Sequence, residues 1–515
     1  MILAPRPSRL RIFLLLSSAL VSSALADPGD GGVGGYNDGE EPGKASLDGA
    51  GGDAETPHRE DFGGAGGGAG VTGGVGGITP DDDPYRAGSG GNGGDHDYSG
   101  NGSDIGSGTV NLQGTDGGAG EDAPETFSAA GGGGGGGGFG AVVTDTSSLN
   151  VTSGSIAGGA GGAGGASPKR YAGAGGSGGY GLVLNKTSGI HTIGATVSGG
   201  SGGDGGDGKY GSYNNGGDGG SGVYLTGHSS PVTVIIEGSV TGGDGGNAGA
   251  VSDQMSADGG DGGDGVRGRN INVVVSSTAS ISGGVGGTPT TDPRNSSWLG
   301  TAGSEGHAIT FSGGTNSLEL QASSGGSLAT LNGGISHAGT NDILKLGGSN
   351  NANFALSGLS GTFSGFGSFQ KTGTATWTLT GTTTSTKDWT VSAGVLKLTG
   401  GSIAGATTVE SGATVQFDQS ANTIHSASID GAGGLKKSGS GTLTLTGNNS
   451  YSGGTNVSAG TLEASTTSVS GNINVSSGAR MRFNQTSDSI YSGAISGAGR
   501  FKKKWCRHSD PDGQQ

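Results

Sequence analysis

Short strands with one apolar face dominate the hydrophobic pattern in the C-terminal half of the chain. Residues 442–446 alternate threonine with leucine and end at the turn signal of residues 447–449. Residues 461–463 and 481–483 repeat this alternation. A period of two predicts β-strands with one buried face, and no helical period interrupts them. Because each strand is too small to be stable alone, the strands must stack on neighbouring units.

A repeat of 66 residues organises these strands. Residues 365–438 align without gaps with residues 431–504, and apolar positions stay apolar while polar positions vary. The matched apolar pairs include Phe369 and Leu435, Leu396 and Leu462, Val409 and Val475, Phe417 and Phe483, and Ile429 and Ile495. We interpret the repeat as three solenoid coils of about 22 residues each.

A shorter period organises the residues upstream. Glycines recur at spacings of 41, 41, 43 and 41 residues, at Gly140, Gly181, Gly222, Gly265 and Gly306. Most of them open a short apolar strand, which a second strand and a glycine block follow. We interpret this period as two coils of about 20 residues, so that one coil size explains both repeats. The two periods predict an all-β fold, a parallel β-helix of roughly 18 coils over residues 131–504 with Gly/Asp-rich loops.

Composition agrees with a repeat fold that needs little core per coil. Glycine supplies 125 of the 515 residues and aromatic residues only 5%, too few for one large globular core. The net charge of −16 argues against nucleic acid or anionic lipid as the main partner. The single cysteine, Cys506, lies at the end of the chain.

The first residues predict export. A positive region with Arg6, Arg9 and Arg11 precedes an apolar stretch at residues 12–25, and Ala24-Leu25-Ala26 fits a cleavage site. We therefore expect a signal peptide at residues 1–26. Residues 27–130 carry glycine runs with weaker strands, which predicts an irregular or partly disordered region.

Motifs for catalysis are weak. Residues 175–179 match G-x-S-x-G, but a chain rich in glycine and serine produces that string by composition, and no acid–histidine pair can be assigned. Seven histidines precede the tail and none has metal-ligand spacing, so we expect surface or turn positions for them: His58, His96, His191, His228, His307, His337 and His425. We expect no catalytic residue, no metal site, no cofactor and no small-molecule substrate.

Calcium is the sharper alternative. Residues 259–266 fit one G-G-x-G-x-D-x-U unit of calcium-binding β-rolls, and residues 202–207 and 90–95 fit its first six positions. A β-roll needs such units in tandem, whereas these stand apart. We favour polar turn loops and keep a secreted Ca²⁺-binding repeat protein as the alternative.

Residues 431–465 read GAGGLKKSGSGTLTLTGNNSYSGGTNVSAGTLEAS and closely resemble the passenger-associated strand repeat of autotransporters. A degenerate copy begins at Gly365 and a third at Gly497. The resemblance implies a right-handed β-helix passenger that is exported and threaded through its own C-terminal outer-membrane β-barrel with the help of the barrel assembly machinery. The resemblance covers about residues 365–504. The two sequence periods predict two β-helix regions, one at residues 131–310 with units of about 41 residues and one at residues 311–504 with 66-residue passenger-associated strand repeats.

The tail departs from this pattern. By register with Gly439, residue 505 should be glycine, but Trp505 stands there. Removing one adenine from the preceding lysine codons permits or forces most of the residues found at positions 438–449. We therefore expect residues 505–515 to be out-of-frame translation and the product to be a periplasmic fragment of a surface protein. For the intact protein we expect a non-enzymatic stalk or adhesin that contacts host cells, other cells or matrix; a passenger enzyme is the lesser alternative.

Overall fold

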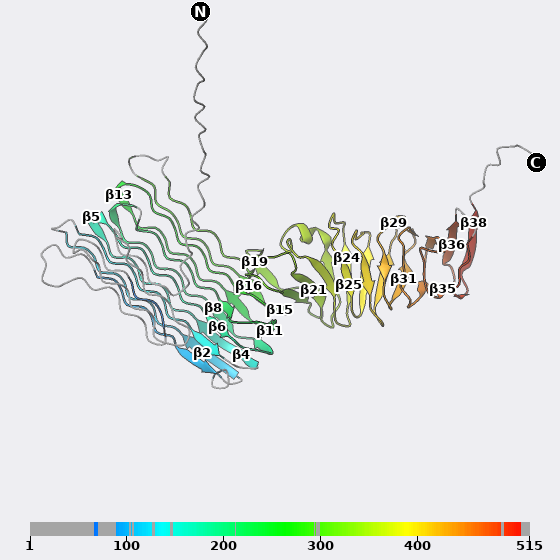
Figure 1. The fold of residues 1–515 in the computed structure, drawn as a ribbon, viewed down its shortest axis with the longest axis horizontal. Helices are drawn as coiled ribbons and strands as arrows, with labels where there is room; N and C mark the ends of the chain where they lie inside the picture. The colour runs from blue at the N-terminus through cyan, green and yellow to red at the C-terminus, as the bar shows by residue number, and fades with distance from the viewer. Residues whose placement is uncertain are drawn as a thin grey trace, which may run out of the picture.

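The computed structural model describes residues 66–70, 89–101, 105, 108–125, 129–144, 148–211, 213–292, 294, 299–485 and 489–505 (Figure 1). The expected signal peptide and residues 506–515 lie outside this part. Within it, all paired strands run parallel, and an isolated bridge between Thr291 and Leu299 is antiparallel. One short 3₁₀ helix, η1 (Leu356–Ser360), is present, and no described helix is long and apolar enough to cross a membrane. The predicted all-β parallel solenoid is confirmed.

Three strand positions build each upstream coil. The first position forms a seven-stranded sheet of β1 (Tyr98–Asn101), β3 (Ala141–Thr144), β6 (Leu182–Asn185), β10 (Val223–Thr226), β14 (Val266–Gly268), β17 (Ile309–Phe311) and β20 (Ile335–His337). The other two belong to a fifteen-stranded sheet whose branches meet at β4 (Ser148–Ala157), with β2 (Gly108–Gln113) beside it. One branch contains β7 (Ile190–Ile193), β11 (Val232–Ile236), β15 (Ile271–Val275) and β18 (Ser317–Gln321). The other contains β8 (Thr196–Ser198), β12 (Ser239–Thr241), β16 (Ser280–Ser282) and β19 (Thr330–Asn332).

Each 41- to 43-residue unit is one coil. Leu182 of β6 pairs with Ala141 of β3 on one side and with Val223 of β10 on the other. Val223 in turn pairs with Val266. Since sequence-equivalent residues are direct neighbours in the sheet, the prediction of two small coils per unit is wrong, and the expected 18 coils are too many. The extra residues of each coil leave the three-sided core and return to it.

These excursions form what we call the glycine lattice, which is visible as the wavy parallel segments in Figure 1. At their far end lies a three-stranded sheet of β5 (Ser167–Tyr171), β9 (Gly208–Tyr210) and β13 (Val251–Gln254). The lattice segments are residues 114–123, 131–140, 158–166, 172–181, 199–207, 214–222, 242–250, 257–265, 283–288 and 300–308, with residues 66–70 and 89–95 beside them.

Hydrogen bonds in the lattice repeat every three residues. The amides of residues 158, 161 and 164 donate to the carbonyls of residues 198, 201 and 204 in the next coil. The amides of residues 159, 162 and 165 donate to residues 138, 135 and 132, which run antiparallel. Three residues per turn without internal bonds is the geometry of the polyproline II helix. The prediction of Gly/Asp-rich loops is therefore wrong for the glycine-rich segments of the lattice. They are ordered extended segments whose backbone groups form hydrogen bonds with neighbouring segments.

Close approach of the backbones explains the glycines. A Cβ atom on Gly162 would lie 2.0 Å from the carbonyl oxygen of Gly118, and one on Gly203 would lie 2.0 Å from that of Gly162. In residues 158–166, 199–207 and 242–250 the third position of each turn carries a side chain that points outward, as at the exposed Ala163 and Asp204. In residues 172–181 the third positions, Ala174, Ser177 and Tyr180, are buried. Two glycines in every three residues are therefore a packing requirement.

Downstream of β20 the coil loses its excursion. The fifteen-stranded sheet continues through β21 (Ile343–Gly347), β23 (Ser368–Lys371), β25 (Trp389–Val391), β27 (Thr407–Val409) and β30 (Ile429–Asp430). An eight-stranded sheet contains β22 (Ala352–Ala355), β24 (Thr376–Thr380), β26 (Val395–Thr399), β28 (Thr414–Asp418), β31 (Gly434–Ser438), β33 (Thr455–Val457), β35 (Ile473–Val475) and β37 (Ile495–Ser496). A five-stranded sheet contains β29 (Thr423–His425), β32 (Thr442–Leu445), β34 (Thr461–Ala464), β36 (Arg480–Gln485) and β38 (Arg500–Trp505).

The 66-residue repeat is longer than three of these coils. Three steps of strand register carry Phe369 through Trp389 and Thr407 to Ile429, which is 60 residues on. The sequence equivalent of Phe369 is instead Leu435, on the next face of the coil, in the eight-stranded sheet. The prediction of three 22-residue coils is therefore wrong, because each repeat also advances by one face.

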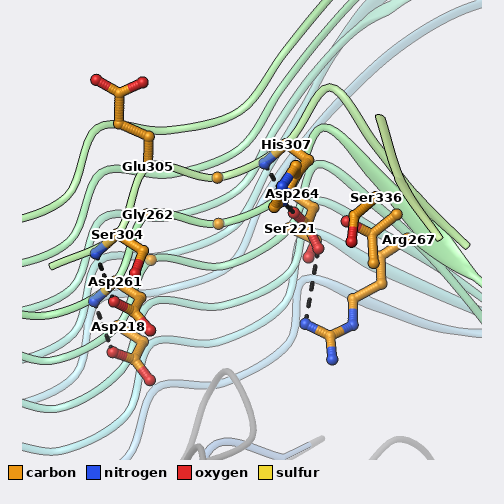
Figure 2. A pocket seen from close by; sticks show the side chains of 14 residues that line it. Asp218, Ser221, Asp261, Gly262, Asp264, Arg267, Ser304, Glu305, His307 and Ser336 are labelled. Atoms are coloured by element: carbon orange, nitrogen blue, oxygen red, sulfur yellow. Dashed lines mark hydrogen bonds and ion pairs between the residues drawn. The ribbon is translucent and has the colours of Figure 1, made fainter. Parts of the chain in front are cut away.

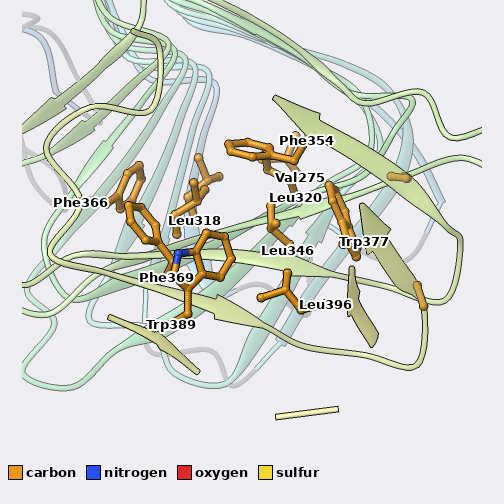
Figure 3. Packing of buried hydrophobic residues seen from close by; sticks show 14 of the residues in the cluster. Val275, Leu318, Leu320, Leu346, Phe354, Phe366, Phe369, Trp377, Trp389 and Leu396 are labelled. Carbon is orange, nitrogen blue, oxygen red and sulfur yellow. The ribbon is translucent and has the colours of Figure 1, made fainter. Parts of the chain in front are cut away.

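One apolar core runs through both halves. Figure 3 shows where the halves meet: Val275, Leu318 and Leu320 of the upstream coils lie beside Leu346, Phe369 and Trp389 of the downstream coils. Trp377 and Trp389 are almost fully buried, and the indole N–H of Trp377 donates to the carbonyl of Gly347 at 2.9 Å. Burying one such large side chain stabilises the fold by about 1.5–3 kcal/mol, so every coil depends on its few inward residues.

Candidate functional site

A polar cavity opens where the glycine lattice meets the seven-stranded sheet. In the early coils this corner is filled by stacked rings, with His96 on Phe139 at 4.2 Å and Tyr180 on Tyr224 at 4.5 Å between ring centroids. In later coils Asp264 and Arg267 take the places of rings, and a cavity of about 250 Å³ results. Its lining residues are Asp218, Gly219, Ser221, Asp261, Gly262, Gly263, Asp264, Arg267, Ser304, Glu305, Gly306, His307, Thr310 and Ser336.

Two columns of side chains form one wall of the cavity (Figure 2). In the first column, Asp218 accepts a hydrogen bond from the backbone N–H of Asp261 at 2.8 Å. Asp261 accepts one from the N–H of Ser304 at 2.6 Å. In the second column, Asp264 accepts one from the N–H of His307 at 2.9 Å. Each bond joins consecutive coils, so every carboxylate caps the backbone of the coil above.

The two columns differ in charge balance. Asp264 has two basic neighbours, since its carboxylate lies 3.6 Å from both Arg267 Nη1 and His307 Nδ1. Asp218 and Asp261 form no ion pair with any described residue. Burial, and then the charge of Asp261, raise the pKa of Asp218 to about 6. The first column therefore holds two stacked carboxylates at the cost of mutual repulsion.

The same capping pattern covers the aspartates of the calcium motif. Asp207 accepts a hydrogen bond from Ala250 N–H at 2.8 Å, and Asp204 accepts one from Asn247 N–H at 2.7 Å. Among the described residues, no group of three or more histidine, cysteine, aspartate or glutamate side chains could hold a metal ion. These carboxylates act as hydrogen-bond acceptors within the lattice, a role that the sequence motif did not reveal.

His191, His337 and His425 lie on strands β7, β20 and β29, which corrects the expectation of surface or turn positions for these three. His228 lies between β10 and β11, in agreement with a turn position. His96, His191, His228 and His425 are buried, and burial lowers the pKa of both His191 and His425 to about 4. His337 Nδ1 lies 2.7 Å from the buried carboxylate of Asp342. His307 lies at the cavity, whereas His58 is outside the described residues.

The serine of the G-x-S-x-G string lies within the glycine lattice. Ser177 is buried, and its carbonyl accepts a hydrogen bond from Gly137 N–H at 2.9 Å. The flanking Gly176 and Gly179 donate to residues 162 and 159. This string is therefore part of the lattice packing, with the three-residue period of the neighbouring segments.

A buried lysine marks each of two successive 66-residue repeats. Lys437 has no solvent exposure, and its ammonium donates to the carbonyls of Ser438, Gly439 and Ala459. Lys371 makes the equivalent bonds to residues 372, 373 and 393. Burial lowers the pKa of Lys437, and it lowers that of Lys371 to about 8. Three ammonium donors thus satisfy three carbonyls at the turn after the strand.

Comparison with known families identifies this repeat. The family model described as passenger-associated-transport-repeat matches residues 369–398 and 435–464. Both matches begin at a buried residue of the strand that carries the lysine, Phe369 in β23 and Leu435 in β31. No curated protein and no solved structure matches the chain. The two family matches support an autotransporter passenger, and membership of such a family implies export to a surface or secreted location.

Proposed function

We propose that the chain is a non-enzymatic autotransporter passenger that serves as a β-helical stalk or adhesin and contacts host or other cells. The observation that carries the proposal is the pair of family matches, together with their structure. In both, the matched apolar positions are buried and the lysine bonds to the following turn. As a passenger it would have an outer-membrane β-barrel and the barrel assembly machinery as partners.

The strand pairing, which joins only neighbouring coils, supports secretion of the chain in an unfolded state. Each strand pairs only with strands of the neighbouring coils, so that folding can propagate from one coil to the next. The only cysteine is Cys506, so no intramolecular disulfide has to form before or after export. A chain that crosses a membrane as an extended polypeptide can then fold progressively on the far side.

Outward polar residues support a role in contact. The lattice presents regularly spaced side chains at its third positions, including Asp204, Asn247 and Thr288 in three successive coils. Along the solenoid axis, neighbouring outward side chains are separated by one backbone segment. Along each segment they are separated by three residues. Such a broad, regular face suits attachment to an extended partner surface.

Surface display tests the passenger assignment. Residues 27–505 are placed between a signal peptide and an autotransporter β-barrel, and protease accessibility is measured on intact cells. We expect the solenoid to appear outside as a protease-resistant fragment. Leu443→Asp, which puts a charge at a buried site of β32, should shorten this fragment, whereas Thr446→Asp at an exposed site should not. Retention of the wild-type segment inside cells whose barrel is inserted would contradict the proposal.

Adhesion is measured on the same cells. Cells that display the solenoid should bind to host-cell monolayers or to one another more than cells that display the barrel alone. Equal binding would remove the adhesin part and leave a stalk. A calcium titration followed by circular dichroism separates this protein from a β-roll, because only a β-roll should gain strand signal or thermal stability.

A further inference from the structure

Part of the polar cavity lies where small and polar side chains replace aromatic rings. Phe139 and Tyr180 occupy one position of two successive coils, and their ring centroids are 5.0 Å apart. Ser221, Asp264 and His307 occupy the same position of the next three coils, as the hydrogen bonds between the coils show. Because serine is much smaller than tyrosine, a space opens at this corner, and all three residues line the cavity of about 250 Å³.

Two hydroxyl groups at this corner have no partner. Ser221 is 1% exposed, and its hydroxyl forms no hydrogen bond with any described residue. The hydroxyl oxygen of Thr310 in β17 is also buried without a partner in the described part of the chain. A buried hydroxyl that lacks a hydrogen bond costs about 1–3 kcal/mol. Since both residues line the cavity, the two hydroxyls point to an occupant that forms hydrogen bonds with them.

Asp264 and Arg267 add an acceptor and a donor beside these hydroxyls. Arg267 Nη1 lies 3.6 Å from Asp264 Oδ2, which is too long for a hydrogen bond, whereas Asp264 Oδ1 accepts the N–H of His307 at 2.9 Å. One carboxylate oxygen and the guanidinium N–H groups are therefore available to a ligand. The side chains of Arg267 and His307 are 41% and 45% exposed, so a ligand can enter from solvent. Figure 2 shows Asp264 and Arg267 beside Ser221 and apart from Asp218.

We propose that this corner of the cavity binds one uncharged sugar ring of a surface glycan. Each sugar hydroxyl both donates and accepts hydrogen bonds, so a sugar needs donors and acceptors side by side. Asp264 supplies the acceptor and Arg267 the donors, and the hydroxyls of Ser221 and Thr310 can serve as either. An anion such as phosphate would only accept, and the carboxylate of Asp264 would repel it.

The size of the cavity limits the ligand. Its volume of about 250 Å³ is below the usual range for drug-sized molecules, which begins near about 300 Å³. The cavity therefore suits a single ring, and the rest of a glycan would remain in solvent. The proposal gives the adhesin function proposed above a class of ligand, and it rests on that function for its biological role.

Saturation-transfer NMR of the purified chain tests the site directly. The probes are the methyl glycosides of glucose, galactose, mannose and N-acetylglucosamine. Tetrahydropyran, a six-membered ring without hydroxyl groups, is the control ligand, and inorganic phosphate is the anionic probe. We expect at least one glycoside to bind and tetrahydropyran and phosphate not to bind.

Variants locate the binding at this corner. Asp264→Asn keeps the Oδ1 acceptor for the backbone bond and removes the second acceptor, so it should weaken binding of the glycoside about tenfold. Thr310→Val keeps the shape of the side chain and removes the hydroxyl, which should weaken binding about threefold. Thr226→Val is the matched control, because Thr226 of β10 is also half-buried but does not line the cavity. Circular dichroism verifies that all variants are folded.

The outcomes separate the site from its competitors. Binding of no glycoside, or unchanged binding by both Asp264→Asn and Thr310→Val, would overturn the proposal. Phosphate binding that becomes tighter in Asp264→Asn, without glycoside binding, would replace the sugar with an anion.

The adhesin function is tested apart from the sugar site, on cells that display the solenoid. If the purified chain binds a glycoside but the displayed solenoid does not promote attachment, the sugar site stands and the adhesin function fails. If the displayed solenoid promotes attachment but the purified chain binds no glycoside, the adhesin function stands and the sugar site fails.

Discussion

A single methyl group should disrupt the glycine lattice, and Gly203→Ala is the cleanest case. Gly203 lies in the segment of residues 199–207, and its φ angle is outside the left-handed region, so alanine is compatible with the backbone conformation. The added Cβ would nevertheless lie 2.0 Å from the carbonyl oxygen of Gly162 and 2.5 Å from its carbon. Both atoms belong to the backbone, so two segments must separate.

The cost follows from the bonds that this separation breaks. Gly203 N–H donates to Gly176 O at 2.8 Å, and Gly176 N–H donates to Gly162 O at 2.8 Å. Losing the partner of a buried amide or carbonyl costs about 1–3 kcal/mol for each group. The reduced entropy of the unfolded chain returns about 0.4–1 kcal/mol to an alanine variant. We therefore expect a net local destabilisation of about 3 kcal/mol.

Native-state hydrogen exchange measures this change best, because a solenoid need not unfold in one step and a global melting curve would average over the coils. Amides of residues 158–207 should lose protection, while those of the downstream coils should not. Gly325→Ala is the control, since the nearest heavy atom to its added Cβ lies at 3.8 Å. If Gly203→Ala keeps wild-type protection within about 0.5 kcal/mol, the close-packed lattice is refuted.

Three further changes probe the caps, the repeat turn and the acidic column. Asp204→Ala should expose the Asn247 amide to exchange at a local cost of about 1 kcal/mol, whereas Asp204→Asn should not. Lys437→Met should destabilise its coil by about 2 kcal/mol in urea unfolding, because three carbonyls lose a charged donor, and Lys436→Met should have little effect. Because the pKa of Asp218 is raised to about 6 in the folded chain, the protonated side chain stabilises the fold. This stabilisation is fully present below about pH 4 and is lost as the pH rises through about 6. The free energy of unfolding of Asp218→Asn relative to that of the wild type should therefore increase between these pH values, by about 3 kcal/mol at most. A difference in free energy that does not change with pH would contradict the raised pKa of Asp218.

The strand pattern was sufficient to predict the core of the downstream coils. Leu443 and Phe483 stand at alternating apolar positions, and both are buried. Period-two alternation fixes which residues face inward, whatever the exact length of the coil. The length of a coil could not be predicted in the same way. A sequence period gives the number of residues between equivalent positions, but it does not say how many strands or coils lie between those positions.

A search for apolar periods could not predict the structure of the glycine-rich segments, because these segments contain few apolar side chains. The pairs 158–159, 161–162 and 164–165 do follow a three-residue period, which is the signal that could have predicted polyproline II segments. Without that assignment, Asp218 and Asp261 are only two aspartates 43 residues apart. Once one unit is known to be one coil, the same spacing stacks them in one column. The cavity was therefore missed because its residues meet only through the register of the coils.

The rotation of the 66-residue repeat shows what the repeated unit is. Lys371 lies in β23 of the fifteen-stranded sheet, Lys437 in β31 of the eight-stranded sheet and Lys503 in β38 of the five-stranded sheet. The first two lysines make equivalent bonds although they stand on different faces. The feature that the two copies share is thus local: a strand whose lysine bonds to the carbonyls of the following turn. The two copies lie on different faces of the coil. Because successive copies occupy successive faces, a solenoid built from this repeat distributes its buried lysines around the axis and does not stack them in one column, where their charges would repel.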